Sequence, residues 1–347
     1  MTTIEVNGKV SHDEWRSYVE RHPEGLVYHL PQWKETLEQS FGHRPFYLFA
    51  RDDEGRFLGT LPLFQVKSPL TGNRLVSLPF SYVCGPIADS ESVKAQLVSR
   101  AQELCHELGC HYLEIRAMRR LSVDMKVSEY FSTYILELSN DPSAVWKKLE
   151  RRSARWPIGK AERDGVTVRV DNSIEGIKMF NKLNQRTKRN LGVPAHPLVF
   201  LENIGTKLAG HFRVYLAEVS GKAIAGILCL SLRDRVIDAY AASDERYLSC
   251  HANDLLVWRA IEDCCKNGYC RFDFGKTPRD NEGLGRFKRK WGAQQHALYY
   301  HYYPILPKLI SSERSGQKYR LLTGFWKKLP LSLTQTMGSM MFRHLDG

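Results

Sequence analysis

The stretch CKNGYCRFDFG, residues 265–275, repeats the pattern of HELGCHYLEIR, residues 106–116. In each copy a helical pattern ends at a glycine, Gly109 or Gly268, and a short strand pattern follows. The two glycines are 159 residues apart, which is the offset of an internal repeat. Because a repeat of this kind fixes the architecture, the rest of the chain is interpreted outward from it.

The same order of elements precedes both copies. Three β-rich segments separated by turn residues lead to an amphipathic helix, and the repeated strand follows that helix. Two β-β-β-α-β units predict two similar domains of α/β (α+β) class, each a mixed central sheet flanked by helices. The first unit is expected at residues 45–80 (β-rich), 90–108 (helix) and 111–116 (strand), and the second at 213–243, 253–266 and 269–274.

Four regions are expected along the chain. The first domain spans residues 1–140 and includes helices at 11–22 and 31–41 around a short extended piece at 26–30. A basic linking helix at 141–165 is expected to break near Trp156-Pro157. The second domain spans 166–304, and a helical tail follows at 305–347. This tail is either a docked pair of helices or an interfacial membrane element. We expect docking, because Pro330 and scattered polar residues interrupt a continuous apolar face.

Positive charge dominates the composition. The 347 residues have a formal net charge of +12. Residues 146–164 hold seven Lys or Arg against three acids, and residues 276–290 hold six against two. Such clusters attract nucleic acid, an anionic membrane surface or a nucleotide-bearing substrate, although they also occur on ordinary solvated surfaces.

Other features indicate the compartment. The eight cysteines lie mostly in apolar patterns without zinc-spaced CxxC pairs, so we expect free thiols in a reducing environment and no metal site. The N-terminus lacks an apolar signal region, and no stretch is long and apolar enough to span a membrane. The expected location is the cytoplasm. Association of the protein with the inner face of the membrane is a further expectation.

A candidate site follows the repeated strand of the second copy. The strand ends in Gly275 and opens into the polar and basic sequence GKTPRDNEGLGRFKRKWGA, residues 275–293. A loop that follows a strand exposes backbone donors, and the cations around it favour an anionic ligand or intermediate. The motifs GxSxG, GxxxxGK[ST] and HExxH are absent from the chain. Hydride and phosphoryl transfer are therefore poorly supported.

The two β-β-β-α-β units indicate acyl transfer to an amine on a GNAT-like scaffold. A coenzyme A acetyltransferase usually has a glycine-rich pyrophosphate loop before its main helix. The corresponding residues here, SDERYLSCHANDLL at 243–256, contain no glycine. This weakens coenzyme A as the donor.

Several motifs carry a family resemblance. The sequences FDFGKT and GLGRFKRKWGA, the loop TKRNLGVP and the basic helix ending in GKAERDGVTV resemble the FemABX peptidoglycan aminoacyltransferases. They resemble more closely the FemAB-related proteins associated with exopolysaccharide (PEP-CTERM) genes. The resemblance covers residues 20–335 and implies tandem GNAT-like domains, with transfer of an amino acid from aminoacyl-tRNA onto an amine of an envelope precursor.

The resemblance also implies roles for residues. Lys288 matches the lysine of the family's FK motif and would stabilise the oxyanion of the tetrahedral intermediate. Arg189, assisted by Lys188, would contact a pyrophosphate of the acceptor. The remaining candidates for substrate binding are Lys276, Arg286, Trp33, Tyr240 and Asn253.

The sequence leaves more than one function open. The preferred one is an aminoacyl- or acyltransferase (EC 2.3) that forms an amide on a peptidoglycan or exopolysaccharide precursor, without a bound cofactor. The donor is aminoacyl-tRNA or acyl-coenzyme A. The acceptor is a nucleotide- or lipid-linked sugar or peptide, tRNA and the membrane surface are further candidate partners, and the expected state is a monomer. The alternatives are an acetyl- or acyl-coenzyme A-dependent N-acyltransferase and a non-catalytic protein that binds nucleic acid or a membrane surface.

Overall fold

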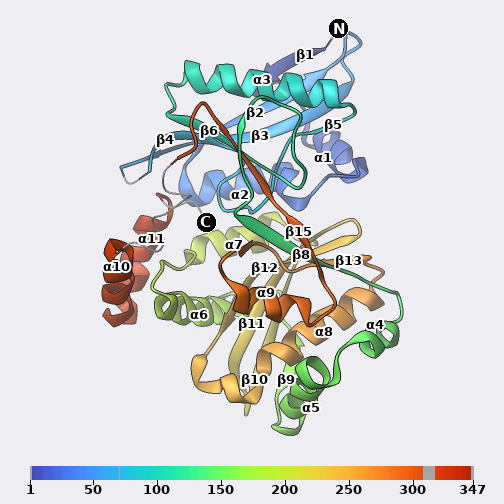
Figure 1. Ribbon diagram of the computed structural model, residues 1–347, viewed down its shortest axis with the longest axis vertical. Coiled ribbons are helices and arrows are strands. Elements are labelled where there is room, and N and C mark those ends of the chain that lie inside the picture. The colour runs from blue at the N-terminus through green and yellow to red at the C-terminus, as the bar shows by residue number, and fades with distance from the viewer. Residues whose placement is uncertain (1, 70, 308–316, 345–347) are drawn as a thin grey trace. The chain divides into compact units, whose positions relative to one another are not determined.

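The computed structural model describes residues 2–69, 71–307 and 317–344, and the chain divides into two compact units (Figure 1). Unit 1 comprises Met1–Phe131, Ala297–Gly316 and Arg343–Gly347. Unit 2 comprises Ser132–His296 and Gln317–Phe342. Each unit contains one mixed sheet flanked by helices, so the predicted tandem of α/β domains is confirmed.

The sheet of unit 1 has the strand order β1-β2-β3-β4-β6-β16-β7, with the short β5 paired to β3. Neighbouring strands on this path are antiparallel except β4 and β6, which are parallel. Helix α3 covers one face, and α1 and α2 lie on the other (Figure 1). The strands are β1 (Thr3–Val6), β2 (Arg44–Arg51), β3 (Phe57–Ser68), β4 (Gly72–Val76), β5 (Ile87–Ala88), β6 (Tyr112–Ala117), β7 (Lys126–Ser128) and β16 (Tyr299–Tyr303). The helices are α1 (His12–Arg21), η1 (Val27–His29), α2 (Pro31–Phe41) and α3 (Glu91–Glu107).

The sheet of unit 2 repeats this topology in the order β14-β8-β13-β12-β11-β10-β9. Its parallel neighbours are β12 and β13, the counterparts of β4 and β6. The strands are β8 (Phe131–Glu137), β9 (Thr167–Val170), β10 (Phe212–Val219), β11 (Lys222–Leu232), β12 (Arg235–Ser243), β13 (Arg271–Asp273), β14 (Thr277–Pro278) and β15 (Gln294–Ala297), which pairs with β8. The helices are α4 (Pro142–Lys148), η2 (Arg151–Arg155), α5 (Trp156–Arg163), α6 (Ile174–Leu191), α7 (Leu198–Lys207), η3 (Glu245–Cys250), α8 (Ala252–Lys266), α9 (Glu282–Arg289), α10 (Gln317–Lys328) and α11 (Leu331–Phe342).

Helices cover both faces of the second sheet. Apolar side chains of α8 join one core with alternate residues of β10 and β11, including Ala225 and Ile227. Gly226 lies between these two residues and faces α6, where a Cβ atom at this glycine would be 3.1 Å from the Phe180 ring. Because side chains alternate along a strand, α6 and α8 lie on opposite faces.

Two strands, β8 and β16, do not belong to the sheet that their position along the chain suggests. β8 follows the main part of unit 1 but pairs with β13 of unit 2, whereas β16 follows unit 2 and pairs with β6 of unit 1. The two strands occupy equivalent places, each antiparallel to the repeated strand of its sheet. The boundaries predicted at residues 140 and 304 lie just after these strands, so long-range pairing rather than any local pattern determines their unit.

Two local predictions were wrong for identifiable reasons. Residues 26–30 were expected to be extended, but Val27–His29 form one 3-10 turn, because the His29 ring nitrogen Nδ1 accepts the Leu26 N–H at 3.1 Å. The linking helix breaks at Leu149 and Glu150, not at Trp156-Pro157. A π-helical turn, η2, continues into α5, and Pro157 lies at the junction between the two.

The C-terminal tail docks on unit 2, as predicted, for the residues that the structure describes. Both α10 and α11 contact α6. The Leu329 carbonyl between them accepts a hydrogen bond of 2.8 Å from Nε of Arg189 on α6. The end of α6 is shaped for this contact, because Gly192 adopts φ +80° and a Cβ atom there would lie 2.9 Å from the Thr323 carbonyl oxygen.

Replacement of Gly192 by Ala is therefore expected to loosen the tail. The left-handed backbone alone costs a non-glycine residue about 1–2 kcal/mol, and the collision with Thr323 adds to that. Gly165→Ala is the matched control, because Gly165 adopts φ +78° with no atom within 4 Å of its Cβ position. Urea unfolding should show a larger loss of stability for Gly192→Ala than for Gly165→Ala. Equal losses would mean that the contact with α10 contributes nothing.

Candidate active site

The candidate active site is built on the loop that follows β13. Gly275 adopts φ +67°, and a Cβ atom there would lie 3.1 Å from the Asp238 carbonyl oxygen, so only glycine fits without strain. The loop ends at Asn281, whose side chain accepts the Leu284 N–H at 3.1 Å and caps α9. Gly285 allows α9 to approach β8, since a Cβ there would be 2.8 Å from the Tyr134 hydroxyl.

Lys288 on α9 points inward and is only 5% exposed. Its Nζ donates to the Gly275 carbonyl at 2.8 Å and to the Lys276 carbonyl at 3.3 Å. The Tyr134 ring centroid lies 5.9 Å from Nζ. An ammonium group has three N–H donors, so a third donor remains beyond these two carbonyls. Burial lowers the pKa of Lys288 to about 8, while the charges of Asp238 and Asp273 act in the opposite direction.

Two carboxylates accompany Lys288, and neither was predicted from the sequence. Asp273 of β13 is fully buried and accepts hydrogen bonds from the Thr133 hydroxyl and, at 2.9 Å, from the Gly275 N–H. Asp238 of β12 has a buried Oδ1 without a hydrogen-bond partner. Burial raises the pKa of Asp238 to about 6, although the Lys288 charge lowers it. A single acid within each of the apolar strand patterns VIDAYA and FDF was the available signal.

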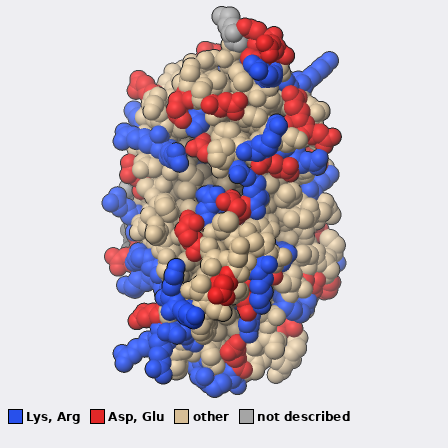
Figure 2. Space-filling model, turned by 90° about the vertical axis from the view of Figure 1, so that its right-hand side faces the viewer, with Lys and Arg blue, Asp and Glu red and all other residues tan. Residues whose placement is uncertain are grey.

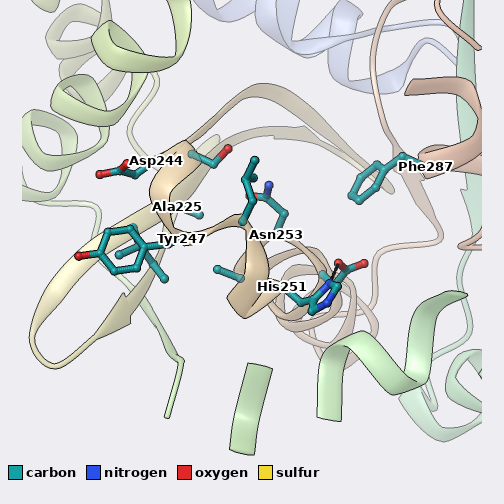
Figure 3. Close-up of a pocket in the computed structure, with 11 residues that line it drawn as sticks. Ala225, Asp244, Tyr247, His251, Asn253 and Phe287 are labelled. Atoms are coloured by element: carbon teal, nitrogen blue, oxygen red, sulfur yellow. Dashed lines mark ion pairs between the residues drawn. The ribbon is translucent and has the colours of Figure 1, made fainter. Parts of the chain in front are cut away.

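A cavity of about 210 Å³ lies at the N-terminus of α8. Figure 3 shows Asn253 between Asp244 on one side and Phe287 of α9 on the other. Two carboxylates line this cavity: Asp244 pairs with Arg246, and Asp254 pairs with Lys290, which directly follows α9. The cavity therefore brings the predicted residue Asn253 close to α9, and a cation offsets the charge of each lining carboxylate.

Lys188 and Tyr240 lie near the buried side chain of His196. The rings of His196 and Tyr240 are 4.4 Å apart, and the charge of Lys188 together with burial lowers the pKa of His196. Burial also lowers the pKa of Lys188. The Tyr240 hydroxyl is buried without a hydrogen-bond partner, as is Nδ2 of Asn184, whose Oδ1 lies 3.4 Å from His196 Nδ1. This polar cluster lies between α6, α7 and β12.

The other predicted site residues differ in burial and in the groups that they contact. Arg189 is half-buried and uses Nε to hold the Leu329 carbonyl, and Lys276 contributes its backbone carbonyl to Lys288. Arg286 is exposed on α9, 3.7 Å from Glu282. Trp33 is fully buried in unit 1, where it packs against Tyr28, so its side chain is part of that core.

The segment that leads to the exposed Trp156 has a basic surface. The cations of this surface that lie exposed are Lys147, Lys148, Arg151 and Arg152 of α4 and η2. Trp156 itself is 53% exposed, and its ring lies 5.6 Å from that of His251, which lines the α8 cavity. Figure 2 looks onto the side of the molecule where α4 and α5 lie and shows Lys and Arg gathered over its lower part.

Within the residues that the structure describes, no three His, Cys, Asp or Glu side chains are grouped so that they could hold a metal ion. None of the helices in the same described ranges has the length and apolar character needed to cross a membrane.

Comparison with known proteins agrees with the fold. Residues 149–289 match the family described as Acetyltransferase (GNAT) domain. No curated protein matches the chain in sequence. The predicted tandem GNAT fold is confirmed.

Three solved structures show the similarity. The crystal structure of FemX has 17% identity and a TM-score of 0.66, covering 84% of this chain and 96% of FemX. L-PGS from Bacillus licheniformis has 13% identity and a TM-score of 0.60, with 94% and 100% covered. A tandem GNAT protein from the clavulanic acid biosynthesis pathway has 10% identity and a TM-score of 0.54, with 88% and 100% covered.

The burial of the Lys288 ammonium leads to a prediction about how the stability of the protein depends on pH. Its pKa in the folded chain, about 8, is below the ordinary value of 10.5, so the unfolded chain binds this proton more tightly. The free energy of unfolding should therefore rise as pH increases from about 8 to about 10.5. Lys288→Met should remove this rise, whereas Lys266→Met, at an exposed position on α8, should keep it. Urea unfolding across this range measures the slope, and an unchanged slope in Lys288→Met would contradict the burial of the charge.

Proposed function

We propose that this chain is an acyltransferase that joins an acyl or aminoacyl group to an amine, with unit 2 as the catalytic unit. The observation that carries the proposal is the buried Lys288 ammonium, which two carbonyls of the loop after β13 hold in one position. A cation fixed in a poorly solvated site is suited to stabilise negative charge that develops during a reaction. The GNAT match over residues 149–289 supports the same class of chemistry.

The reaction balances without a covalent enzyme intermediate. The acceptor amine attacks the carbonyl carbon of an activated ester, and the carbonyl oxygen becomes an oxyanion. The third N–H of Lys288 donates to this oxyanion. The tetrahedral intermediate then collapses, the C–O bond of the ester breaks, and the proton that the amine loses goes to the leaving alkoxide, directly or through water. The products are an amide and an alcohol.

Asp238 supports the charge of Lys288 in this mechanism. Its carboxylate raises the lysine pKa against the effect of burial, so the ammonium stays protonated near neutral pH. In this proposal Asp238 acts on the reaction through the charge of Lys288.

An aminoacyl ester of tRNA is the proposed donor. Residues 243–256, which lead into α8, contain no glycine, so the glycine-rich loop that usually holds the diphosphate of coenzyme A is absent from this position. The basic segment that leads to Trp156 offers exposed cations and an exposed aromatic ring, a combination that suits unpaired nucleotides at the end of an RNA. Acyl-coenzyme A is the second candidate donor, because the matched family is described as an acetyltransferase.

The proposed acceptor is a cell-envelope precursor of the peptidoglycan or exopolysaccharide type, linked to a nucleotide or a lipid. The likeness to FemX and to a putative lysylphosphatidylglycerol synthetase supports an envelope acceptor. Arg189 and Lys188 would bind its phosphates, with Lys276, Arg286, Tyr240 and Asn253 as further contacts to donor or acceptor. The protein is proposed to act as a monomer in the cytoplasm, at the inner face of the membrane.

A label-transfer assay tests the function. The protein is offered labelled aminoacyl-tRNA and labelled acetyl-coenzyme A separately, with an envelope-precursor fraction as acceptor, and the labelled amide is measured. We expect the aminoacyl label to move and Lys288→Met to lower kcat by about 10²–10³-fold. Lys266→Met, an exposed lysine, should keep full activity.

The other outcomes of this assay are equally informative. Movement of the acetyl label alone would make coenzyme A the donor. No transfer from either donor, together with salt-sensitive nucleic-acid binding that survives Lys288→Met, would indicate a non-catalytic binding protein.

The pH dependence of transfer tests the roles of Lys288 and Asp238. Since the charged lysine is the active form, kcat should fall as pH rises through about 8. Asp238→Asn removes the carboxylate that raises the lysine pKa, so the fall should begin at a lower pH. Asp234→Asn, at a partly exposed carboxylate paired with Arg271, is the control and should not move the profile. A rate that rises through pH 8 would instead make Lys288 a base and reject the mechanism.

A further inference from the structure

The C-terminal helix α11 has two faces of different character. Thr334, Gly338 and Phe342 are buried, and Gly338 lies close to Pro194 and Trp326. Apolar side chains on the other face stay exposed at helical spacing: Leu333 is 49% exposed, Met337 41% and Met340 66%. These three residues form an apolar stripe of the kind that marks an interaction surface when it lies on a docked helix.

The neighbouring sequence is basic and free of acids. Helix α11 contains no charged residue, and α10 adds Phe325, which is 63% exposed, beside the exposed Lys327 and Lys328. Between residues 317 and 345 the sequence has five cations and no Asp or Glu. These cations are Lys318, Arg320, Lys327, Lys328 and Arg343.

We propose that the α10–α11 pair is a docking surface for an anionic phospholipid membrane, an interaction that goes beyond the acyl transfer proposed above. An interfacial element of this kind needs an apolar stripe that enters the boundary of the acyl chains and cations that meet the headgroups. Both are present: the stripe of Leu333, Met337 and Met340 with Phe325, and the lysines at the end of α10.

Charge argues against other occupants. A second copy of this chain carries a net charge of +12 and would bring like charge toward the α10 lysines. A nucleic acid would pair with the lysines but would leave the apolar stripe of α11 against a polar surface. An anionic lipid surface satisfies both features at once.

Two hydrogen bonds attach the helix pair to α6 of unit 2. Arg189 of α6 donates to the Leu329 carbonyl at 2.8 Å, and Gln335 of α11 donates to Gln185 of α6. A membrane bound by α11 would thus lie near the C-terminal end of α6. If the proposed function holds, this places Arg189 where a lipid-linked acceptor would present its phosphates.

Vesicle binding tests this surface without any assay of transfer. The full chain is sedimented with vesicles of phosphatidylcholine alone and of phosphatidylcholine mixed with phosphatidylglycerol. We expect binding to the anionic vesicles only, weakened by added salt. The triple substitution Leu333→Gln, Met337→Gln and Met340→Gln should weaken it at least about tenfold, and Lys327→Gln with Lys328→Gln by about tenfold.

Matched control variants test whether vesicle binding depends on the α10–α11 surface or on positive charge and exposed apolar groups in general. Lys147→Gln with Lys148→Gln makes the same charge change at another exposed lysine pair, and Val170→Gln with Ile174→Gln removes other exposed apolar groups of unit 2. Both should bind as the unchanged protein does, and thermal unfolding should show every variant folded. The proposal is overturned by absent vesicle binding, by binding that the α11 substitutions leave intact, or by equal losses in the Lys147 and Lys148 variant. It is also overturned if α11 instead forms a dimer in sedimentation and binds no vesicle.

Discussion

The candidate site depends on the early separation of two parallel strands. β12 and β13 pair only from Arg235 with Arg271 to Ile237 with Asp273. Beyond that point β13 leaves the sheet at Gly275, and the next side chain of β12, Asp238, has lost its parallel neighbour. Backbone carbonyls freed in this way need donors. The Lys288 ammonium supplies them for Gly275 and Lys276, so the same interaction satisfies the loop and fixes the cation.

The parallel strands of unit 1 separate in the same way as those of unit 2. β4 and β6 also pair over three residues, Arg74–Val76 with Tyr112–Glu114. In the repeat, Arg116 of unit 1 stands at the position of Gly275, and Glu114 stands at that of Asp273. The Arg116 guanidinium is buried, pairs with Glu114 at 2.7 Å and donates to the Ser81 carbonyl. Because this guanidinium donates its N–H groups within the unit, no buried lysine equivalent to Lys288 is found among the described residues of unit 1.

The sequence predicted what local patterns encode. Helix α2 was predicted at its observed bounds, and the strands of the repeat were placed correctly because their turns and glycines recur at a fixed offset. Lys288 lies in a recognisable motif. The exchange of β8 and β16 between the sheets has no local signal, since each pairs with a strand more than 130 residues away along the chain. Asp238 and Asp273 were missed for a similar reason, because only the fold brings two isolated acids close to a lysine on a later helix.

The site and the C-terminal helices use positive charge in opposite ways. Lys288 is buried, and its reduced pKa expresses the cost of removing an ammonium from water. Lys327 and Lys328 are exposed beside an apolar stripe, where their charge acts over the distance that salt allows. A buried cation can act on a single atom of a substrate, whereas exposed cations act on a surface. The two proposals therefore predict different responses to salt: binding at the surface should weaken with ionic strength, whereas an interaction within the buried site should be shielded from it.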